Sequence, residues 1–428
     1  MISLEPPVER ALLVGAPRKG TGARHHVDEH LEELERLADT AGAHVVGTLT
    51  QQLDRPNPAT YLGSGKIEEL RARIEAEQVT LVIFDDELSP SQGKNIEDAT
   101  GHRVMDRAEL ILDIFATRAR SREARLQVEL AQLEYMLPRL TRMWTHLEKF
   151  RGGIGVRGPG ETQLETDRRL ISHRIRVLKE RLLDVQRSRA VQREGRKHAF
   201  RAALVGYTNA GKSSILKAMS GDPDVFVEDR LFATLDTLTR EVDLGDRQRV
   251  LLTDTVGFIR KLPHHLVASF RATLEEVLEA DLLLHVVDAS HPTWEEHRVV
   301  VDEVLAELGA HDKPVLYVFN KSDLLSAEEQ HGLQDWLRAM LPDHVLINTR
   351  TPASVAPLRD ALRERIAALR PLTELRVDAG NGRLLADVHR SGEVVGQRAE
   401  GNVLVLLTRI EPAALARLQR AGAVLGTP

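Results

Sequence analysis

The sequence predicts an α/β protein in which a central α/β domain follows a small α/β domain and an antiparallel helical hairpin, and precedes a small α+β domain. Three observations support this prediction. Short apolar runs alternate with helical patterns in the first quarter of the chain, leucines repeat at helical spacing on both sides of a glycine-rich stretch, and strand-like runs in the central part end at polar motifs. We place the four parts at residues 1–117, 118–198, 199–371 and 372–428 of the 428-residue chain.

The N-terminal domain is predicted from residues 8–117. Its strand-like apolar runs are residues 11–15, 44–47 and 81–84. Residues 27–41 have a helical pattern, and this alternation indicates a mainly parallel sheet. The stretch Gly63-Ser-Gly-Lys66 shares residue types with phosphate-binding loops but lacks their full spacing, so we interpret it as a structural turn. ATP use by this domain stays an open alternative.

The hairpin is predicted from apolar residues at four-three spacing. They are Leu126, Leu130, Leu133, Leu137 and Leu140, continued by Met143 and Leu147, and then Ile171, Ile175, Leu178, Leu182 and Val185. Residues 151–160, between the two sets, hold too many glycines to stay helical. We therefore expect two antiparallel helices with a glycine-rich loop at the tip, and a kink in the first helix at Pro138.

The hairpin is also strongly basic. The net charge of the chain is −6, yet residues 118–201 hold 21 Lys and Arg against 10 Asp and Glu. A basic arm on an acidic body suits a phosphate-rich partner, and a glycine loop lets the backbone approach a ribose-phosphate chain. The residues expected to contact RNA are Arg151, Gly152, Gly153, Arg157, Arg168 and Arg169. The alternative is that these arginines only solvate two exposed helix faces.

The central domain opens with a phosphate loop. The pattern GxxxxGK[ST] at residues 206–213 directly follows the strand-like run 200–206. Lys212 can reach the β- and γ-phosphates, the Ser213 hydroxyl can ligate Mg²⁺, and a helix from Lys212 to about Met219 presents its positive end to the anion. The loop residues expected to bind the nucleotide are Gly206, Tyr207, Thr208, Asn209, Ala210, Gly211, Lys212, Ser213 and Ser214. The alternative is a glycine turn that merely opens a helix.

A second buried strand ends at Asp254, which suits the carboxylate that holds Mg²⁺ in P-loop enzymes. Gly257 lets its backbone N–H approach the γ-phosphate. Upstream, residues 231–237 should fold over that phosphate. Thr234 is our choice for the hydroxyl that completes the Mg²⁺ shell, and Thr237 is the second choice. The alternative is that these residues form an ordinary threonine-rich strand. Lys212, Thr234 and Gly257 are the residues expected to act in catalysis.

A third strand, residues 314–320, delivers the pattern Asn320-Lys321-Ser322-Asp323. The Asp323 carboxylate can accept both base-edge N–H groups that guanine has and adenine lacks, while the Lys321 stem covers the ring. A buried acceptor left unpaired costs about 1–3 kcal/mol, enough to prefer GTP over ATP tenfold or more. These motifs together predict a P-loop GTPase (G) domain.

Phe258 follows Gly257, where Ras-like enzymes place the glutamine that orients the attacking water. An aromatic ring cannot hydrogen-bond that water. Intrinsic hydrolysis should therefore be slow and should depend on groups or rearrangements supplied by a partner. His264 or His265 could substitute, although an ordinary solvated histidine is the simpler interpretation.

The chain resembles the HflX family of ribosome-associated, translational GTPases over nearly its whole length. The matching segments beyond the phosphate loop are residues 61–70, 106–116, 127–133, 158–169, 254–259 and 262–264. The block at residues 158–169 is the most specific of them. Three features depart from the family pattern. Asn348, Thr349 and Arg350 stand where the family usually has a Ser-Ala pair that supports the guanine ring from behind, a contact that a backbone N–H here could still make. Residues 236–240 lack the usual proline, and Lys261 stands where an acidic residue is common. The resemblance implies that the hairpin tip enters the large ribosomal subunit, and that the factor splits or rescues stalled ribosomes.

The remaining features are consistent with such a factor. Residues 393–396 and 402–408 are strand-like and residues 412–421 helical, which predicts the small α+β domain. The sequence shows no apolar membrane span, no signal-like pattern and no cysteine, so we expect a cytoplasmic protein. We also expect a monomer that uses GTP and Mg²⁺. One alternative is a binding module that hydrolyses GTP poorly and uses it only as a conformational latch. The other is a GTP switch acting on a partner other than the ribosome.

Overall fold

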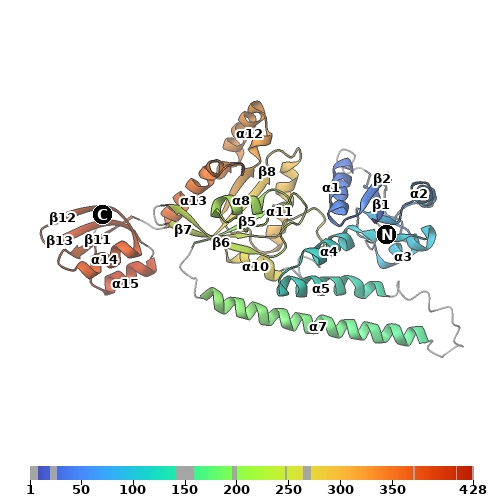
Figure 1. The fold of residues 1–428 in the computed structure, drawn as a ribbon, viewed down its shortest axis with the longest axis horizontal. Helices are drawn as coiled ribbons and strands as arrows, with labels where there is room; N and C mark the ends of the chain where they lie inside the picture. The colour runs from blue at the N-terminus through green and yellow to red at the C-terminus, as the bar shows by residue number, and fades with distance from the viewer. Residues whose placement is uncertain are drawn as a thin grey trace, which may run out of the picture.

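The computed structural model describes residues 8–19, 27–140, 159–194, 200–245, 248–263, 271–369, 372–410 and 412–426. Their strands form three sheets of four, six and four strands. Figure 1 shows these sheets in a row, in chain order, with the long helix α7 (Pro159–Glu194) running alongside the first two. No helix among these residues is long and apolar enough to cross a bilayer.

The N-terminal sheet is parallel, in the order β2-β1-β3-β4. Its strands are β1 (Arg10–Gly15), β2 (His44–Thr50), β3 (Leu81–Phe84) and β4 (Arg103–Asp106). The helices are α1 (Val27–Thr40), α2 (Ser64–Glu77), α3 (Pro90–Thr100) and α4 (Arg107–Arg118). Every residue of β3 is buried, as expected for a parallel strand covered on both faces. The predicted small α/β domain is confirmed.

Helices α5 (Arg122–Met136) and α7 lie side by side and run in opposite directions (Figure 1). Their seam consists of the apolar residues Leu126, Leu130, Leu133, Ile175, Leu178 and Leu182. At 1.5 Å per residue, the 36 residues of α7 span about 54 Å. The expected kink at Pro138 is wrong in detail, because α5 ends at Met136 and Pro138 lies in a 3₁₀ turn, η1 (Leu137–Arg139).

The central sheet has the order β10-β9-β8-β5-β7-β6, with only β6 antiparallel to its neighbour. Its strands are β5 (Phe200–Gly206), β6 (Leu238–Gly245), β7 (Gln248–Asp254), β8 (Leu282–Asp288), β9 (Val315–Asn320) and β10 (His344–Leu346). The helices are α8 (Lys212–Ser220), α10 (Arg271–Glu279), α11 (Trp294–Glu307), α12 (Ala327–Met340) and α13 (Ala356–Leu369), with 3₁₀ turns η2 (Ser322–Leu324) and η3 (Pro352–Val355).

The C-terminal sheet is antiparallel, in the order β12-β13-β11-β14. Its elements are β11 (Leu372–Asp378), α14 (Gly382–Ser391), β12 (Gly392–Glu400), β13 (Val403–Ile410), α15 (Pro412–Arg420) and β14 (Val424–Leu425). Both helices pack on a core that includes Leu375, Leu406, Val388 and Leu418. The predicted α+β fold is confirmed, although the sequence analysis recognised only β12, β13 and α15.

Candidate functional site

The carboxyl ends of four parallel strands meet at one edge of the central sheet. β5 ends at Gly206, β7 at Asp254, β8 at Asp288 and β9 at Asn320. β5 lies between β7 and β8, at a point where the chain connections diverge to the two sides. Ligands of open α/β sheets bind at such a point, outside the carboxyl ends of the strands. The motifs assigned to the nucleotide lie at this edge.

The phosphate loop runs from the end of β5 to the first turn of α8. Gly211 has a φ of +97°, and a Cβ there would collide with the side-chain amide of Asn320. Asn320 Nδ2 donates a hydrogen bond to the carbonyl oxygen of Ala210 at 3.0 Å. The end of β9 therefore holds the loop in shape, and only glycine leaves room for that contact.

Lys212 is buried against the phosphate loop. Its Nζ donates to the carbonyl oxygens of Gly206 at 3.1 Å and Tyr207 at 2.8 Å. Burial lowers the pKa of this ammonium to about 8, although the nearby Asp254 carboxylate opposes the shift. Gly257 faces the same ammonium, because a Cβ built on it would lie 3.1 Å from Nζ. An anion bound here would meet a buried positive charge and an unobstructed backbone.

Three oxygen-bearing side chains converge beside Lys212. Ser213 Oγ donates to Asp254 Oδ2 at 2.6 Å and lies 2.7 Å from Thr234 Oγ1. Asp254 Oδ1 is buried and has no hydrogen-bond partner, and burial raises the pKa of this carboxyl group. Hydroxyl and carboxylate oxygens are the ligands that Mg²⁺ prefers. The three residues assigned to the metal therefore lie together and fit that ion.

The cavity above the phosphate loop has a volume of about 50 Å³. The predicted site residues that line it are Thr208, Asn209, Gly211, Lys212, Ser213, Ser214, Thr234 and Gly257. Most of the remaining lining comes from residues between Val227 and Thr234, which cover the loop.

The residues assigned to guanine lie at the end of β9. Lys321 has a φ of +62°, and its Nζ lies 2.7 Å from Asp288 Oδ2. The Asp323 carboxylate pairs with the guanidinium of Arg350. Arg350 also donates its backbone N–H to Asn348 Oδ1 at 3.2 Å, which places Thr349 in the same turn. The segment expected behind the base is therefore brought to Asp323, with Arg350 on the carboxylate itself.

Phe258 is fully buried, with 1% of its surface exposed. Its backbone N–H donates to the carbonyl of Gly206 at 3.1 Å, and its carbonyl accepts the N–H of Thr208 at 2.7 Å. These bonds join the segment after Asp254 to the phosphate loop. The ring points into the core and offers nothing that could orient a water molecule. His264 and His265 lie outside the described residues.

The phosphate loop also contacts the N-terminal domain through Tyr207. Its hydroxyl donates to the Glu33 carboxylate on α1 and accepts the backbone N–H of Arg260 at 2.9 Å. Burial opposes the charge of Glu33, yet the guanidinium groups of Arg107 and Arg260 hold its pKa below its usual range. The sequence analysis missed this contact, because Glu33 and Tyr207 are 174 positions apart.

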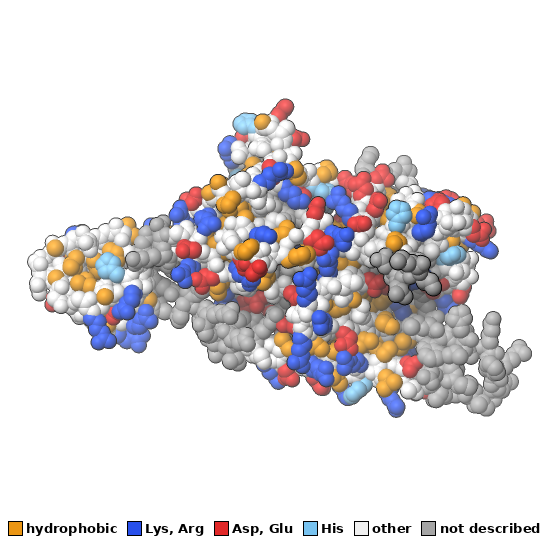
Figure 2. All heavy atoms as spheres, in the orientation of Figure 1, with side chains coloured by type: hydrophobic (Ala, Val, Ile, Leu, Met, Phe, Trp, Pro, Cys, Tyr) orange, Lys and Arg blue, Asp and Glu red, His pale blue; other side chains and the backbone are white. Residues whose placement is uncertain are grey.

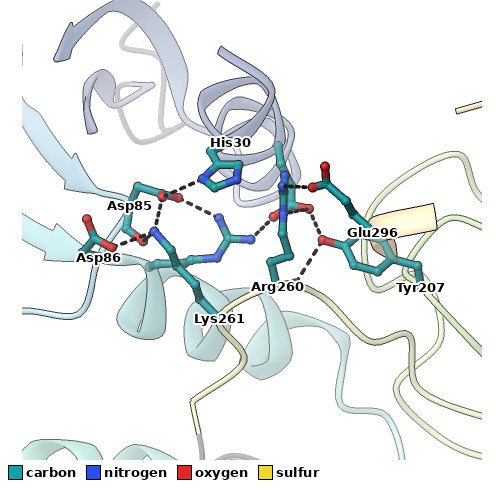
Figure 3. Close-up of polar contacts among 9 residues, drawn as sticks. His30, Asp85, Asp86, Tyr207, Arg260, Lys261 and Glu296 are labelled. Carbon is teal, nitrogen blue, oxygen red and sulfur yellow. Dashed lines mark hydrogen bonds and ion pairs between the residues drawn. The ribbon is translucent and has the colours of Figure 1, made fainter. Parts of the chain in front are cut away.

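Figure 3 shows the rest of this buried ionic cluster between the two domains. Arg107, whose side chain is 3% exposed, pairs with Glu33 and with Asp85, the latter at 2.8 Å. Lys261, three residues after Phe258, reaches Asp85 Oδ2 at 2.5 Å and Asp86 Oδ1 at 2.6 Å. The departure from the family pattern at Lys261 is therefore complemented by two carboxylates of the N-terminal domain.

A second set of contacts joins the segment around Thr234 to the base of the hairpin. Arg118, at the end of α4, donates to Glu228 Oε2 at 2.6 Å. The rings of Phe115 and Phe232 meet edge to face at 4.8 Å. Two residues that precede Thr234, Glu228 and Phe232, are thus anchored to the elements that lead into the hairpin.

The basic arm is described only in part. Arg151, Gly152, Gly153 and Arg157 lie outside the described residues. Arg168 and Arg169 are exposed on α7. Further along α7, Arg174 and Lys179 pair with Glu129 and Glu134 of α5. Figure 2 shows basic and acidic side chains mixed over the described part of this helix.

Three family models match consecutive parts of the chain. Residues 28–116 match the model described as GTP-binding GTPase N-terminal, and residues 118–196 match its GTP-binding GTPase middle region. Residues 201–321 match a model described as 50S ribosome-binding GTPase. The three matches follow one another through the N-terminal sheet, the helical pair and most of the central sheet.

Relatives with similar sequences are described as GTPase HflX. The protein of Magnetococcus marinus is 45% identical over 422 residues, which cover 98% of this chain and 96% of the relative. That of Flavobacterium psychrophilum is 52% identical and covers 74% of this chain and 76% of its own. A GTP-binding protein of Sulfolobus solfataricus, solved in complex with GDP, is 24% identical with a TM-score of 0.42, covering 83% of this chain and 98% of its own.

Proposed function

Because the chain belongs to the HflX family of GTPases, as its resemblance predicted, we propose that it hydrolyses GTP and binds the large ribosomal subunit in its GTP state. The observation that carries the proposal is the convergence of Ser213, Thr234 and Asp254 beside the buried Lys212, with Asp254 Oδ1 left without a partner. Such an arrangement serves a metal-bound polyphosphate and little else.

The nucleotide lies along the carboxyl edge of the central sheet. The phosphate loop from Gly206 to Ser214 wraps the phosphates, and Asp323 reads the base after Arg350 moves aside. Asn320 keeps its structural bond to the loop. Bound at Ser213, Thr234 and Asp254, Mg²⁺ would supply positive charge to the phosphate oxygens. These contacts are the same ones that the sequence analysis assigned.

Hydrolysis proceeds by in-line attack of water on the γ-phosphorus. Lys212 stabilises the negative charge that develops on the phosphate oxygens, and the backbone N–H of Gly257 donates to the γ-phosphate. Phe258 contributes nothing to the water, because its ring is buried. The intrinsic rate is therefore low, and docking on the ribosome raises it.

The hairpin at residues 118–198 is the ribosome-binding element of this proposal. Its proposed contacts with the phosphate backbone of ribosomal RNA are Arg168 and Arg169 on α7 and, from the sequence alone, Arg151 and Arg157. In this role the factor splits or rescues stalled ribosomes as a cytoplasmic monomer. The four domain ranges of the sequence analysis are retained in this scheme.

The buried Phe258 also favours a second candidate, a hydrolysis-poor module that GTP latches onto the ribosome. Phosphate release with and without large subunits separates the two functions. Many turnovers per molecule support the enzyme, whereas a single stoichiometric burst supports the latch. Lys212→Ala and Ser213→Ala should abolish turnover, and normal turnover in either variant contradicts the site assignment. Glu241→Gln, at an exposed surface ion pair of the same domain, is the control.

A further inference from the structure

One arginine faces the phosphate loop from the segment that covers it. Arg230 lines the small cavity over the loop, and among the described residues of that lining the cations are Lys212 and Arg230. The side chain of Arg230 is 49% exposed, unlike the buried Lys212. Its guanidinium is therefore available to a ligand in this cavity.

The backbone around Arg230 is fixed to the phosphate loop on both sides. Asn209 Nδ2 donates to Asp229 Oδ1 at 2.8 Å. Phe232 donates its N–H to Thr208 Oγ1 at 2.9 Å and is itself buried. Arg230 lies between these two anchors, and its side chain lines both the cavity over the loop and the larger adjoining cavity that also includes residues of α1.

The guanidinium of Arg230 is held aside by one carboxylate. Glu228 Oε1 lies 3.4 Å from Arg230 Nε. The other oxygen of Glu228 accepts a hydrogen bond from Arg118, at the base of the hairpin, at 2.6 Å. This neighbouring bond holds the pKa of Glu228 below its usual range, so the carboxylate stays charged at neutral pH. Glu228 thus joins Arg230 to the hairpin.

A second arginine near the phosphate loop, Arg260, faces carboxylates at the domain interface. Arg260 has a side chain that is 12% exposed and faces Glu33 and Glu296 at the domain interface (Figure 3). Its guanidinium points into the ionic cluster and away from the cavity lined by Lys212. Arg230 is thus the arginine best placed to reach a γ-phosphate.

We propose that Arg230 is a cis-acting catalytic arginine, which leaves Glu228 and binds the γ-phosphate oxygens as GTP is hydrolysed. In that step the water oxygen bonds to the γ-phosphorus and the bond from phosphorus to the β–γ bridging oxygen breaks. The electron pair stays on GDP, and the proton of the water passes to the released phosphate. The guanidinium neutralises charge on the transferred group. This inference rests on the proposed GTPase function and supplies a group that Phe258 lacks.

Glu228 is the positioning residue of the same device. When the hairpin docks and Arg118 shifts, Glu228 shifts with it and Arg230 is released towards the phosphate. Stimulation by the ribosome then requires no catalytic group from the partner. A variant without the Glu228 charge should hydrolyse GTP faster than the wild type in the absence of ribosomes.

Single-turnover hydrolysis of GTP by the full chain, with and without large ribosomal subunits, tests the proposal. Arg230→Ala should lower the rate at least tenfold while GTP affinity changes less than threefold, and Arg230→Lys should recover little because a lysine lacks the planar fork. Arg249→Ala, at an exposed surface ion pair of the same domain, is the control. Arg230→Ala should also fail to bind GDP with aluminium fluoride, which mimics the transferred phosphoryl group.

Glu228→Gln should raise the rate without ribosomes at least threefold, and adding Arg230→Ala should cancel the rise. The proposal is overturned if Arg230→Ala hydrolyses GTP within twofold of the wild type, or binds GDP with aluminium fluoride equally well. Lys212→Ala distinguishes failure of the arginine proposal from failure of the proposed GTPase function. If that variant is also fully active, the proposed GTPase site itself is wrong, whereas activity retained only in Arg230→Ala refutes the arginine alone.

Discussion

The carboxylate of Asp236 accepts hydrogen bonds from two backbone N–H groups that directly precede α5, including that of Ser121 at 3.1 Å. The N–H of Arg120 donates to the same oxygen at 3.1 Å, and the Ser121 hydroxyl contacts the other. Ser121 is the N-cap of α5, since its Oγ accepts the N–H of Ala124. Asp236 follows Thr234 by two residues, so the segment assigned to the metal is bonded directly to the first turn of the hairpin.

Asp236→Ala should loosen the start of α5. Capping interactions of this kind contribute about 1 kcal/mol, which corresponds to roughly a fivefold rise in hydrogen exchange. We expect faster amide exchange at residues 121–125 and a smaller difference between the GTP and GDP states. Hydrogen exchange followed by mass spectrometry measures both, with the exposed Asp224→Ala as control. Unchanged exchange at the start of α5 would refute the link between this segment and the hairpin.

Arg107→Met should destabilise the N-terminal domain strongly. The variant removes the cation that the buried Glu33 and Asp85 share, leaving Arg260 near Glu33 and Lys261 on Asp85, and breaking a buried pair in this way typically costs about 3–5 kcal/mol. Arg103→Met, which removes an ion pair of a half-exposed arginine, should cost less than about 1 kcal/mol. Thermal unfolding followed by calorimetry compares the two variants. Equal melting temperatures would mean that the buried cluster contributes no more than a surface pair.

Acid should weaken the interface between the N-terminal and central domains. Burial lowers the pKa of His297 to about 4, and that of His30 to about 4 with help from the Arg260 charge. Both histidines are therefore neutral in the fold but take up protons when unfolded below about pH 6.5. Their contribution to stability is complete above pH 6.5 and is lost as the pH falls from 6.5 to 4.

The loss should amount to about 1–2 kcal/mol for the pair after solvent screening. Melting temperatures measured from pH 7.5 to 4.5 provide the test. His297→Phe keeps a ring against Tyr207, which His297 stacks on at 3.8 Å, but cannot titrate. Its melting temperature should fall less over this pH range than that of the wild type. A parallel fall in both proteins would exclude His297 as a cause.

Asp323→Asn should weaken GTP binding at least tenfold, since an amide cannot accept both N–H groups of guanine, a loss of about 1–3 kcal/mol. The same amide can pair with the 2-oxo group of xanthine, so affinity for xanthosine triphosphate should rise. Arg350→Ala removes the guanidinium from Asp323 but leaves the carboxylate, and it should retain the preference for GTP. Fluorescence titrations with GTP, ATP and xanthosine triphosphate measure these affinities. A loss of guanine preference in Arg350→Ala would assign base recognition to the arginine instead.

The part of the site that the sequence predicted comes from local patterns. Asp254 and Asn320 stand at the ends of apolar runs, Ser213 completes the phosphate loop that follows a third run, and parallel strands bring their carboxyl ends to one edge. Thr234 followed from its place between two such motifs. The C-terminal strand β11 carried a usable signal as well, because its apolar and polar residues alternate, but that signal was overlooked.

The contacts between domains could not be predicted in the same way. Glu33 meets Arg107 from 74 positions away and Tyr207 from 174, and no periodicity links them. The sequence assigned no role to Asp236, whereas its bond to Ser121 places its carboxylate against the start of α5. Long-range pairs of single polar residues leave no pattern in one sequence, whereas strand ends and helix seams do.

Cosedimentation with large ribosomal subunits, over a salt series and with a non-hydrolysable GTP analogue or GDP, tests the central claim most directly. The analogue should give tight binding that weakens steeply with salt, and GDP should give little. Arg151→Ala combined with Arg157→Ala should weaken binding at least tenfold and reduce the salt slope by about 2. Arg338→Ala with Arg383→Ala removes the same charge from exposed sites outside the hairpin and should change little. Equal binding in GDP, or wild-type binding without Arg151 and Arg157, would contradict the account.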